Sequence, residues 1–177
     1  MEKLSDCMAS ALTLGGLFRY PVKSFAGESF SALDVDARGL VYDRHWMLVD
    51  RDGRFLTQRQ VPRMALIGSR VTRAGDLLLR APGRSDIEVG PATGDPVEVG
   101  VWRDRVRASP VDPAADAWLQ EFLALDCRLV ALPDGAIRAV DPDYARPADQ
   151  VGFVDGFPFL LISQASQTAR TGGCRQP

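Results

Sequence analysis

A β-hairpin is predicted by the stretch Trp46-Met-Leu-Val-Asp-Arg-Asp-Gly-Arg-Phe-Leu-Thr57, in which two short apolar segments flank a polar turn. The Asp52-Gly53 pair in this turn tolerates the positive φ angles that tight hairpin turns require. Similar apolar segments recur up to residue 108 and are separated by Gly, Pro and Asp. Such spacing is typical of the antiparallel strands of a small barrel or sandwich. A mainly β fold is therefore expected.

Further strand signals lie on both sides of the hairpin, and one helix follows them. The strand signals cover residues 14–19, 29–36, 64–71, 77–80, 87–89, 97–102 and 106–108. The helix is predicted because Asp112 can accept an N-cap hydrogen bond, Pro113 suits the first helical position, and residues 118–123 carry an apolar stripe. A strand over Cys127–Leu132 should follow it. Core packing is the expected role of Trp46, Trp102, Trp118 and Phe122.

The last part of the chain predicts a change of domain. Residues 133–150 are rich in Pro, Asp and Ala and are predicted to link a β domain at residues 13–132 to the beginning of a second, truncated domain at residues 151–177. The apolar run Phe157–Ile162 is predicted to be a strand covered on both faces, and Ser163 to cap a helix after it. The alternative is that this strand completes the first domain.

The composition is that of an ordinary globular protein. Hydrophobic residues make up 46% and charged residues 25% of the 177 residues. No apolar run approaches the roughly 18 residues needed to span a bilayer. Lys+Arg 21 against Asp+Glu 23 gives a net charge of −2, with the basic residues scattered along the chain. We therefore expect a cytoplasmic protein that binds neither nucleic acid nor a membrane.

The residue types that hold transition metals are scarce. His45 is the single histidine, and Cys7, Cys127 and Cys174 are far apart with no Cys-x-x-Cys pair. This pattern excludes a histidine-cluster metal site and a disulfide framework, and it is typical of a reducing compartment. Cys127 lies in an apolar segment and is expected to be a buried, unreactive thiol. No metal ligand is assigned.

The segment Tyr20-Pro-Val-Lys-Ser24 carries the strongest binding signal. Its proline turn presents the ammonium of Lys23 and the hydroxyl of Ser24 side by side at the end of a predicted strand. Lysine binds phosphate as a point charge, and serine adds a hydrogen-bond donor. The chain otherwise uses arginine for nearly all of its cations, which favours a specific role for Lys23. The alternative is an ordinary solvated lysine in a turn.

Two other polar clusters surround the predicted hairpin. Arg44 could hold a phosphate with its planar guanidinium, and the alternative is a surface ion pair with Asp43 or Asp50. The polar cluster Thr57–Gln60 directly follows the hairpin. It either lines a pocket or ends the hairpin, and the residues alone leave both alternatives open.

These motifs together resemble the MOSC N-terminal β-barrel domain followed by the beginning of the MOSC domain, over approximately residues 13–168. The resemblance is carried by the motifs Tyr20-Pro-Val-Lys-Ser24, Gly39-Leu40, Asp43-Arg-His-Trp46, Asp52-Gly-Arg-Phe-Leu-Thr57, Arg59-Gln-Val-Pro-Arg63 and Asp155–Ser166 in this order. Each is weak alone, but their order makes the resemblance specific. It implies an N-terminal barrel of short antiparallel strands with one helix, then the first strand and helix start of an incomplete MOSC domain.

The resemblance also implies a bound molybdenum cofactor, a pterin with a terminal phosphate. By resemblance, Lys23, Ser24 and Arg44 hold the phosphate and pterin, while Gly156 and Phe157 supply backbone contacts. The implied reaction is reduction of small N-hydroxylated compounds by an amidoxime reducing component-like oxidoreductase. Its electrons would come from a ferredoxin-like domain or another donor protein.

The metal-ligating cysteine of the family lies beyond residue 177, and neither Cys127 nor Cys174 matches its position. Whether this chain is itself an enzyme is therefore left open. One alternative is a non-catalytic barrel that docks onto a partner through Phe157–Ile162. Another is a sulfur-transfer role in molybdenum cofactor maturation, which would need a reactive cysteine.

Overall fold

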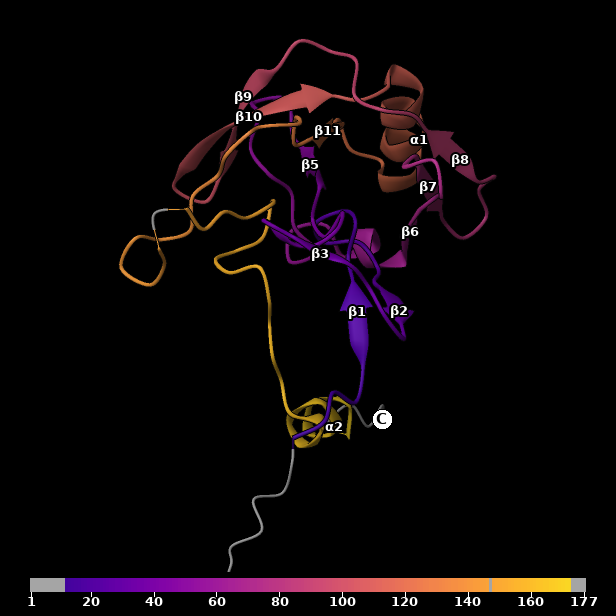
Figure 1. Ribbon diagram of the computed structural model, residues 1–177. Helices are drawn as coiled ribbons and strands as arrows, with labels where there is room; N and C mark the ends of the chain where they lie inside the picture. Colours follow the sequence, from indigo (N-terminus) through magenta and orange to yellow (C-terminus); the bar gives the residue numbers. More distant parts are fainter. Residues whose placement is uncertain (1–11, 147, 173–177) are drawn as a thin grey trace, which may run out of the picture.

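The computed structural model describes residues 12–146 and 148–172, and it confirms the mainly β prediction (Figure 1). The strands are β1 Leu17–Arg19, β2 Glu28–Phe30, β3 Val35–Asp36, β4 Gly39–Leu40, β5 Trp46–Val49, β6 Gly68–Val71, β7 Leu77–Arg80, β8 Ile87–Val89, β9 Val97–Val101, β10 Asp104–Pro110 and β11 Arg128–Ala131. The helices are the 3-10 helix η1 Pro62–Leu66, α1 Pro113–Leu123 and α2 Gln164–Gly172. Among the described residues, no helix is both long and apolar enough to cross a bilayer.

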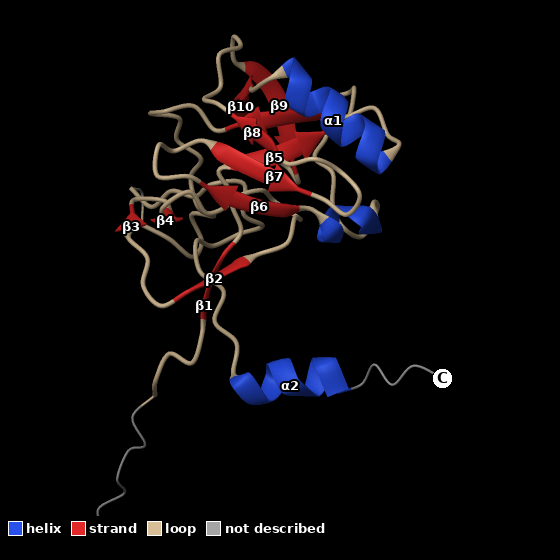
Figure 2. Cartoon of the chain, turned by 90° about the vertical axis from the view of Figure 1, so that its right-hand side faces the viewer, coloured by secondary structure: helices blue, strands red, loops and turns tan. Residues whose placement is uncertain are grey.

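The strands form a curled, half-barrel arrangement of antiparallel sheets. The main sheet has the order β5-β11-β10-β9, a second sheet has the order β6-β7-β8, and β1-β2 and β3-β4 form two short ladders. Isolated bridges join these sheets, for example between Val22 and Trp46 and between Ala26 and Gly68. Helix α1 packs over the strands, whereas α2 lies apart from them at the end of an extended segment (Figures 1 and 2).

The predicted hairpin at residues 46–57 is present. Gly53 adopts a φ of 74° in the turn, a conformation that glycine takes without steric strain. The Leu56 amide donates to the Leu48 carbonyl at 2.9 Å, and Val49 pairs with Phe55. The second arm is shorter than predicted, and on its outer side the Phe55 amide donates to the Gly100 carbonyl of β9 at 3.2 Å.

The hairpin strand β5 is buried on both faces and separates two hydrophobic clusters. Trp46 and Leu48 face the cluster beneath α1, while Met47 and Val49 face the other cluster. Phe153, which is distant in sequence, is fully buried in this second cluster. Packing therefore ties the segment around Phe153 to the main sheet.

The prediction of a buried strand at Phe157–Ile162 is wrong. This segment has no regular secondary structure, and its Leu160 and Leu161 are 79% and 84% exposed. A continuous apolar run forms a buried strand only where neighbouring strands pair with it, and no strand of the described residues does. The helix after it is present, and Ser163 Oγ accepts a hydrogen bond from the Ser166 amide at 3.1 Å.

Three further sequence predictions need correction. Residues 29–36 do not form one strand but contribute to both β2 and β3. The first part of the segment 64–71 is helical, because Pro62 begins the turn η1. Trp102 is not a core residue, since it is 51% exposed in the β9–β10 turn with a φ of 55°. The other predicted core aromatics, Trp46, Trp118 and Phe122, are buried.

The N-cap of α1 gives a first testable prediction. Asp112 Oδ1 accepts a hydrogen bond from the Ala114 amide at 2.8 Å, as predicted from the sequence. Asp112→Ala should lower the free energy of unfolding by about 1 kcal/mol, because this amide loses its partner. Asp112→Asn, which retains an N-cap oxygen, should lose much less in urea denaturation. Equal losses in the two variants would contradict the capping role.

Candidate functional site

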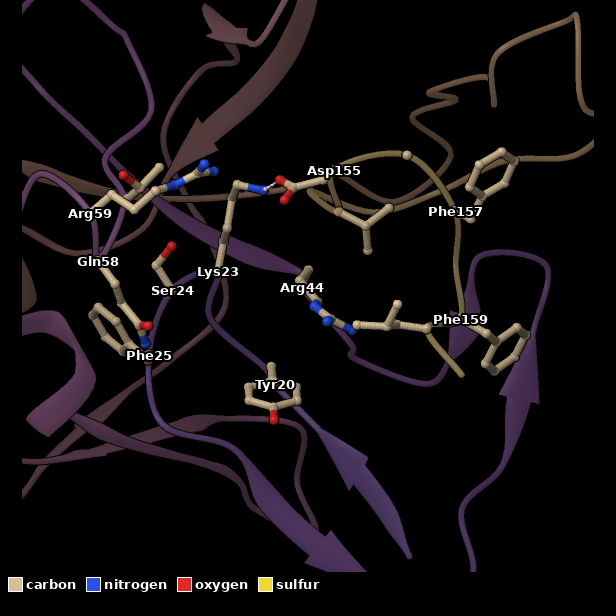
Figure 3. A pocket seen from close by; sticks show the side chains of 14 residues that line it. Tyr20, Lys23, Ser24, Phe25, Arg44, Gln58, Arg59, Asp155, Phe157 and Phe159 are labelled. Carbon is tan, nitrogen blue, oxygen red and sulfur yellow. Dashed lines mark hydrogen bonds and ion pairs between the residues drawn. The ribbon is translucent and has the colours of Figure 1, made fainter. Parts of the chain in front are cut away.

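A cavity of about 490 Å³ lies where three loops meet beside β5 (Figure 3). It is lined by residues 20, 23–25, 57–59, 154–157, 159 and 160, together with Arg44. The five site residues predicted from the sequence all line it, namely Lys23, Ser24, Arg44, Gly156 and Phe157. The structure thus brings these residues together, and their role in binding a ligand stays a prediction.

Backbone hydrogen bonds fix the loop that carries Lys23 to the start of β5. Pro21 has no amide hydrogen, so β1 cannot continue as a paired strand. The Lys23 amide donates to the Trp46 carbonyl at 2.9 Å, and the Trp46 amide donates to the Pro21 carbonyl at 3.1 Å. Ser24 has a φ of 68°, which turns the chain sharply while keeping Ser24 in the cavity lining next to Lys23.

Lys23 is a buried cation, so the structure does not support the alternative of a solvated turn lysine. Its side chain is 7% exposed, and its Nζ donates to the Phe153 carbonyl at 2.9 Å and to Asp155 Oδ1 at 2.5 Å. The ring of Phe55 lies 5.5 Å from the ammonium. Burial lowers the pKa of Lys23 below its usual 10.5, and the hydrogen bond to Asp155 only partly opposes this shift.

Arg44 is held in the cavity lining by two neighbours. Its guanidinium pairs with the buried carboxylate of Asp43 and lies 4.9 Å from the centre of the Tyr20 ring. Asp43 Oδ1 also accepts the Tyr20 amide at 2.8 Å. A Cβ at Gly27 would lie 2.5 Å from this ring, so glycine is required there. The ion pair with Asp43 that was considered as an alternative is therefore present, and it orients Arg44 without removing it from the cavity.

The structure resolves the question left open for Thr57–Gln60, because residues 57–59 line the cavity. The guanidinium of Arg59 lies 5.6 Å from the centre of the Trp102 ring. Trp102 in turn contacts Phe55 at 4.9 Å between ring centres and donates its Nε1–H to Asp155 Oδ1 at 3.0 Å. The roles of Trp102 and Asp155 were missed, because the turn that carries Trp102 meets residue 155 only in the folded chain.

The charges around the cavity favour an anionic ligand. Three cations line it, Lys23, Arg44 and Arg59, against the carboxylate of Asp155 in the lining and that of Asp43 paired with Arg44 behind it. Burial acts to raise the pKa of Asp155, but hydrogen bonds from Lys23 and Trp102 outweigh it, and the pKa lies below the usual 3.8. Asp155 is therefore ionised at neutral pH, and the cavity retains an excess of positive charge.

Two residues whose side chains can take part in catalysis, His45 and Cys127, lie outside this cavity. Burial lowers the pKa of His45 to about 4, so its imidazole is neutral, and the ring packs against Trp46 at 4.5 Å between centres. Burial raises the pKa of Cys127 to about 12, which confirms the predicted buried, unreactive thiol. Cys7 and Cys174 lie outside the described residues, within which no group of three metal-ligating side chains occurs.

Comparison with known proteins gives a consistent picture. Residues 11–126 match the MOSC N-terminal beta barrel domain. The chain is 33% identical over 165 residues to mitochondrial amidoxime-reducing component 1 of Mus musculus, which covers 87% of this chain and 48% of that protein. It is also 33% identical over 179 residues to molybdenum cofactor sulfurase of Danio rerio, which covers 94% of this chain and 21% of that protein. The chain thus spans about half, or less, of these relatives.

One solved structure, a solution structure of a Bordetella bronchiseptica protein, is similar with a TM-score of 0.48 and 19% identity. The similarity covers 63% of this chain and 94% of that protein.

Two glycines beside the cavity give a second prediction. A Cβ at Gly152 would lie 2.8 Å from the Arg44 carbonyl oxygen and 3.0 Å from that of Asp43, whereas a Cβ at Gly156 would meet nothing within 4 Å. Gly152→Ala should therefore lower the free energy of unfolding by about 1–3 kcal/mol. Gly156→Ala should leave it within about 0.5 kcal/mol in the same urea titration. Equal stability of the two variants would contradict the close docking of residue 152.

Proposed function

The chain belongs to the MOSC N-terminal beta barrel domain family, and on this premise we propose that its cavity binds the phosphate end of the molybdenum cofactor. Relatives named amidoxime-reducing component and molybdenum cofactor sulfurase match along most of this chain. The observation that carries the proposal is the buried ammonium of Lys23, which lines a cavity with two arginines and a serine. A buried cation is costly unless it has anionic or strongly polar partners, and this one faces a cavity that can receive them.

The donor set fits a phosphate group. Lys23 offers a point charge, Arg44 a planar pair of N–H donors and Ser24 a hydroxyl, and all three line one cavity. The volume of about 490 Å³ lies within the range of roughly 300–1,000 Å³ that is usual for small-molecule sites. Gly156 and Phe157 border the same cavity, where they would contact the pterin.

The proposed reaction is reduction of small N-hydroxylated compounds, with electrons delivered by a ferredoxin-like or other donor protein. The cofactor would supply the two-electron redox chemistry of its metal. The described part of this chain would bind and orient it, with Lys23, Arg44 and Ser24 neutralising the phosphate. Within the described part of the chain no metal ligand is assigned, because its one cysteine, Cys127, is a buried, protonated thiol.

Two alternatives make different predictions. A sulfur-transfer role would need a reactive thiolate, and Cys127 does not provide one, since its pKa is raised to about 12. A non-catalytic docking module is favoured by the exposed apolar side chains of Phe157–Ile162. Such a module would self-associate and would bind no pterin, which size-exclusion chromatography with light scattering and a pterin assay would detect.

The proposal predicts that Lys23→Met lowers molybdopterin binding at least about tenfold, because a charge-assisted hydrogen bond contributes about 1.5–3 kcal/mol. Methionine keeps most of the side-chain volume in this buried position. Arg73→Met is the matched control, because Arg73 is exposed and lies outside the cavity lining. Bound molybdopterin is measured by the fluorescence of its oxidised form after incubation with each purified chain. Equal pterin content in Lys23→Met and the unmodified chain would contradict the proposal.

The lowered pKa of Lys23 predicts the pH dependence of anion binding. The ammonium loses its proton below the usual 10.5, so affinity for inorganic phosphate should fall as pH rises through this lowered pKa. From about pH 8 upward a phosphate group is already doubly charged, so its own ionisation does not contribute. Lys23→Arg, which stays charged, should shift the fall to higher pH. An unchanged profile in calorimetric titrations would show that Lys23 does not control binding.

A further inference from the structure

The carboxylate of Asp155 already pairs with the ammonium of Lys23, the cation that the proposed function assigns to a ligand. Its Oδ1 accepts a hydrogen bond from Lys23 Nζ at 2.5 Å (Figure 3) and another from Trp102 Nε1 at 3.0 Å. An ammonium has three N–H donors, and Lys23 uses two of them on Asp155 and the Phe153 carbonyl. Only one donor of Lys23 remains for an external anion.

We propose that Asp155 is an internal anion that occupies the Lys23 site, and that an external ligand binds by displacing its carboxylate. This inference rests on the proposed function, because it concerns the same cation. It also restricts the ligand class. A singly charged anion such as acetate gains little by replacing one carboxylate with another, whereas a doubly charged phosphate group gains a stronger interaction with Lys23 and its neighbouring arginines.

The chain passes from buried residues to an exposed one at Asp155. The carboxylate can therefore move away from Lys23 without disturbing the sheet. Residues 151–154 are buried, and the Phe153 amide donates to the Arg44 carbonyl at 2.8 Å. Arg138 fixes this segment further by donating to the Gly152 carbonyl at 2.9 Å and the Val154 carbonyl at 2.7 Å. The Asp155 side chain, by contrast, is 67% exposed. Phe153 therefore keeps its hydrogen bond to Lys23 while Asp155 can rotate away.

Trp102 is the positioning residue for this internal anion. It occupies a strained left-handed conformation, with a φ of 55°, at the β9–β10 turn, and such strain in a bulky residue is found where surrounding contacts enforce it. Those contacts are the Phe55 ring at 4.9 Å and the carboxylate of Asp155. Its single indole N–H is therefore committed to holding Asp155 beside Lys23.

The test is calorimetric titration of the full 177-residue chain with inorganic phosphate and, separately, with acetate. Asp155→Asn keeps the size of the side chain and removes its charge, so its Kd for phosphate should fall about tenfold, a difference of about 1.4 kcal/mol. Acetate binding, weak in the unmodified chain, should improve by a similar factor, because both anions escape the same internal competitor, whereas loss of a nearby negative charge alone would favour the doubly charged phosphate more. Asp95→Asn is the matched control, because Asp95 is exposed and outside the cavity lining, and it should change neither Kd.

Trp102→Phe provides a second readout, because it keeps the aromatic contact with Phe55 and removes the N–H that holds Asp155. Its phosphate affinity should rise, in the same direction as in Asp155→Asn. In the unmodified chain phosphate should also change the tryptophan fluorescence, and this change should be absent from Trp102→Phe.

The outcomes distinguish failure of the displacement by Asp155 from failure of the proposed function. Phosphate affinity that is unchanged or weaker in Asp155→Asn, while Lys23→Met abolishes binding, would overturn the displacement and leave the proposed function intact. Absence of phosphate binding in every variant, together with no molybdopterin binding, would overturn the proposed function itself. Equal gains in Asp95→Asn and Asp155→Asn would reduce the effect to net charge and would also overturn the displacement.

Discussion

The site depends on the hydrogen bond between Lys23 Nζ and the Phe153 carbonyl, which joins residues 130 positions apart in the sequence. Lys23 is fixed at one end by its backbone contact with the start of β5, and Phe153 at the other by its burial against the same strand. A misplaced Phe153 would leave a buried ammonium without its backbone partner, which is strongly unfavourable. The cavity therefore depends on the docking of the segment around Phe153 against the main sheet.

The same arrangement explains why the cavity is polar although it borders two hydrophobic clusters. The ammonium of Lys23 lies 5.5 Å from the centre of the Phe55 ring and the guanidinium of Arg44 lies 4.9 Å from that of Tyr20, while both cationic residues line the cavity. Long cationic side chains commonly bury their stems in this way. Because each cation also lies near an aromatic ring, its position is fixed before any ligand arrives.

The hairpin, the helix cap and the cationic residues of the cavity could be predicted because their signals lie in neighbouring residues of the sequence. The hairpin at residues 46–57 and the cap at Asp112 depend on neighbouring residues, so turn and capping rules identify them. Lys23, Ser24 and Arg44 were predicted as site residues from local chemistry, and the structure brings them to one cavity, while their role in binding phosphate stays a prediction. The apolar run Phe157–Ile162 was misassigned because its composition says nothing about whether other strands cover it, and burial is a tertiary property.

The contact between Trp102 and Asp155 shows where sequence reasoning ends. Nothing in a tryptophan that follows a strand distinguishes a core residue from one that leaves the core at a turn, and here the left-handed backbone of Trp102 decides the matter. The motif that begins at Asp155 likewise gives no signal for the contacts of its carboxylate, because its partners come from segments more than 50 residues away. Local motifs therefore identify the cations of a site, whereas the anion that balances them is found only once the chain has folded. The net charge offered to a ligand depends on both.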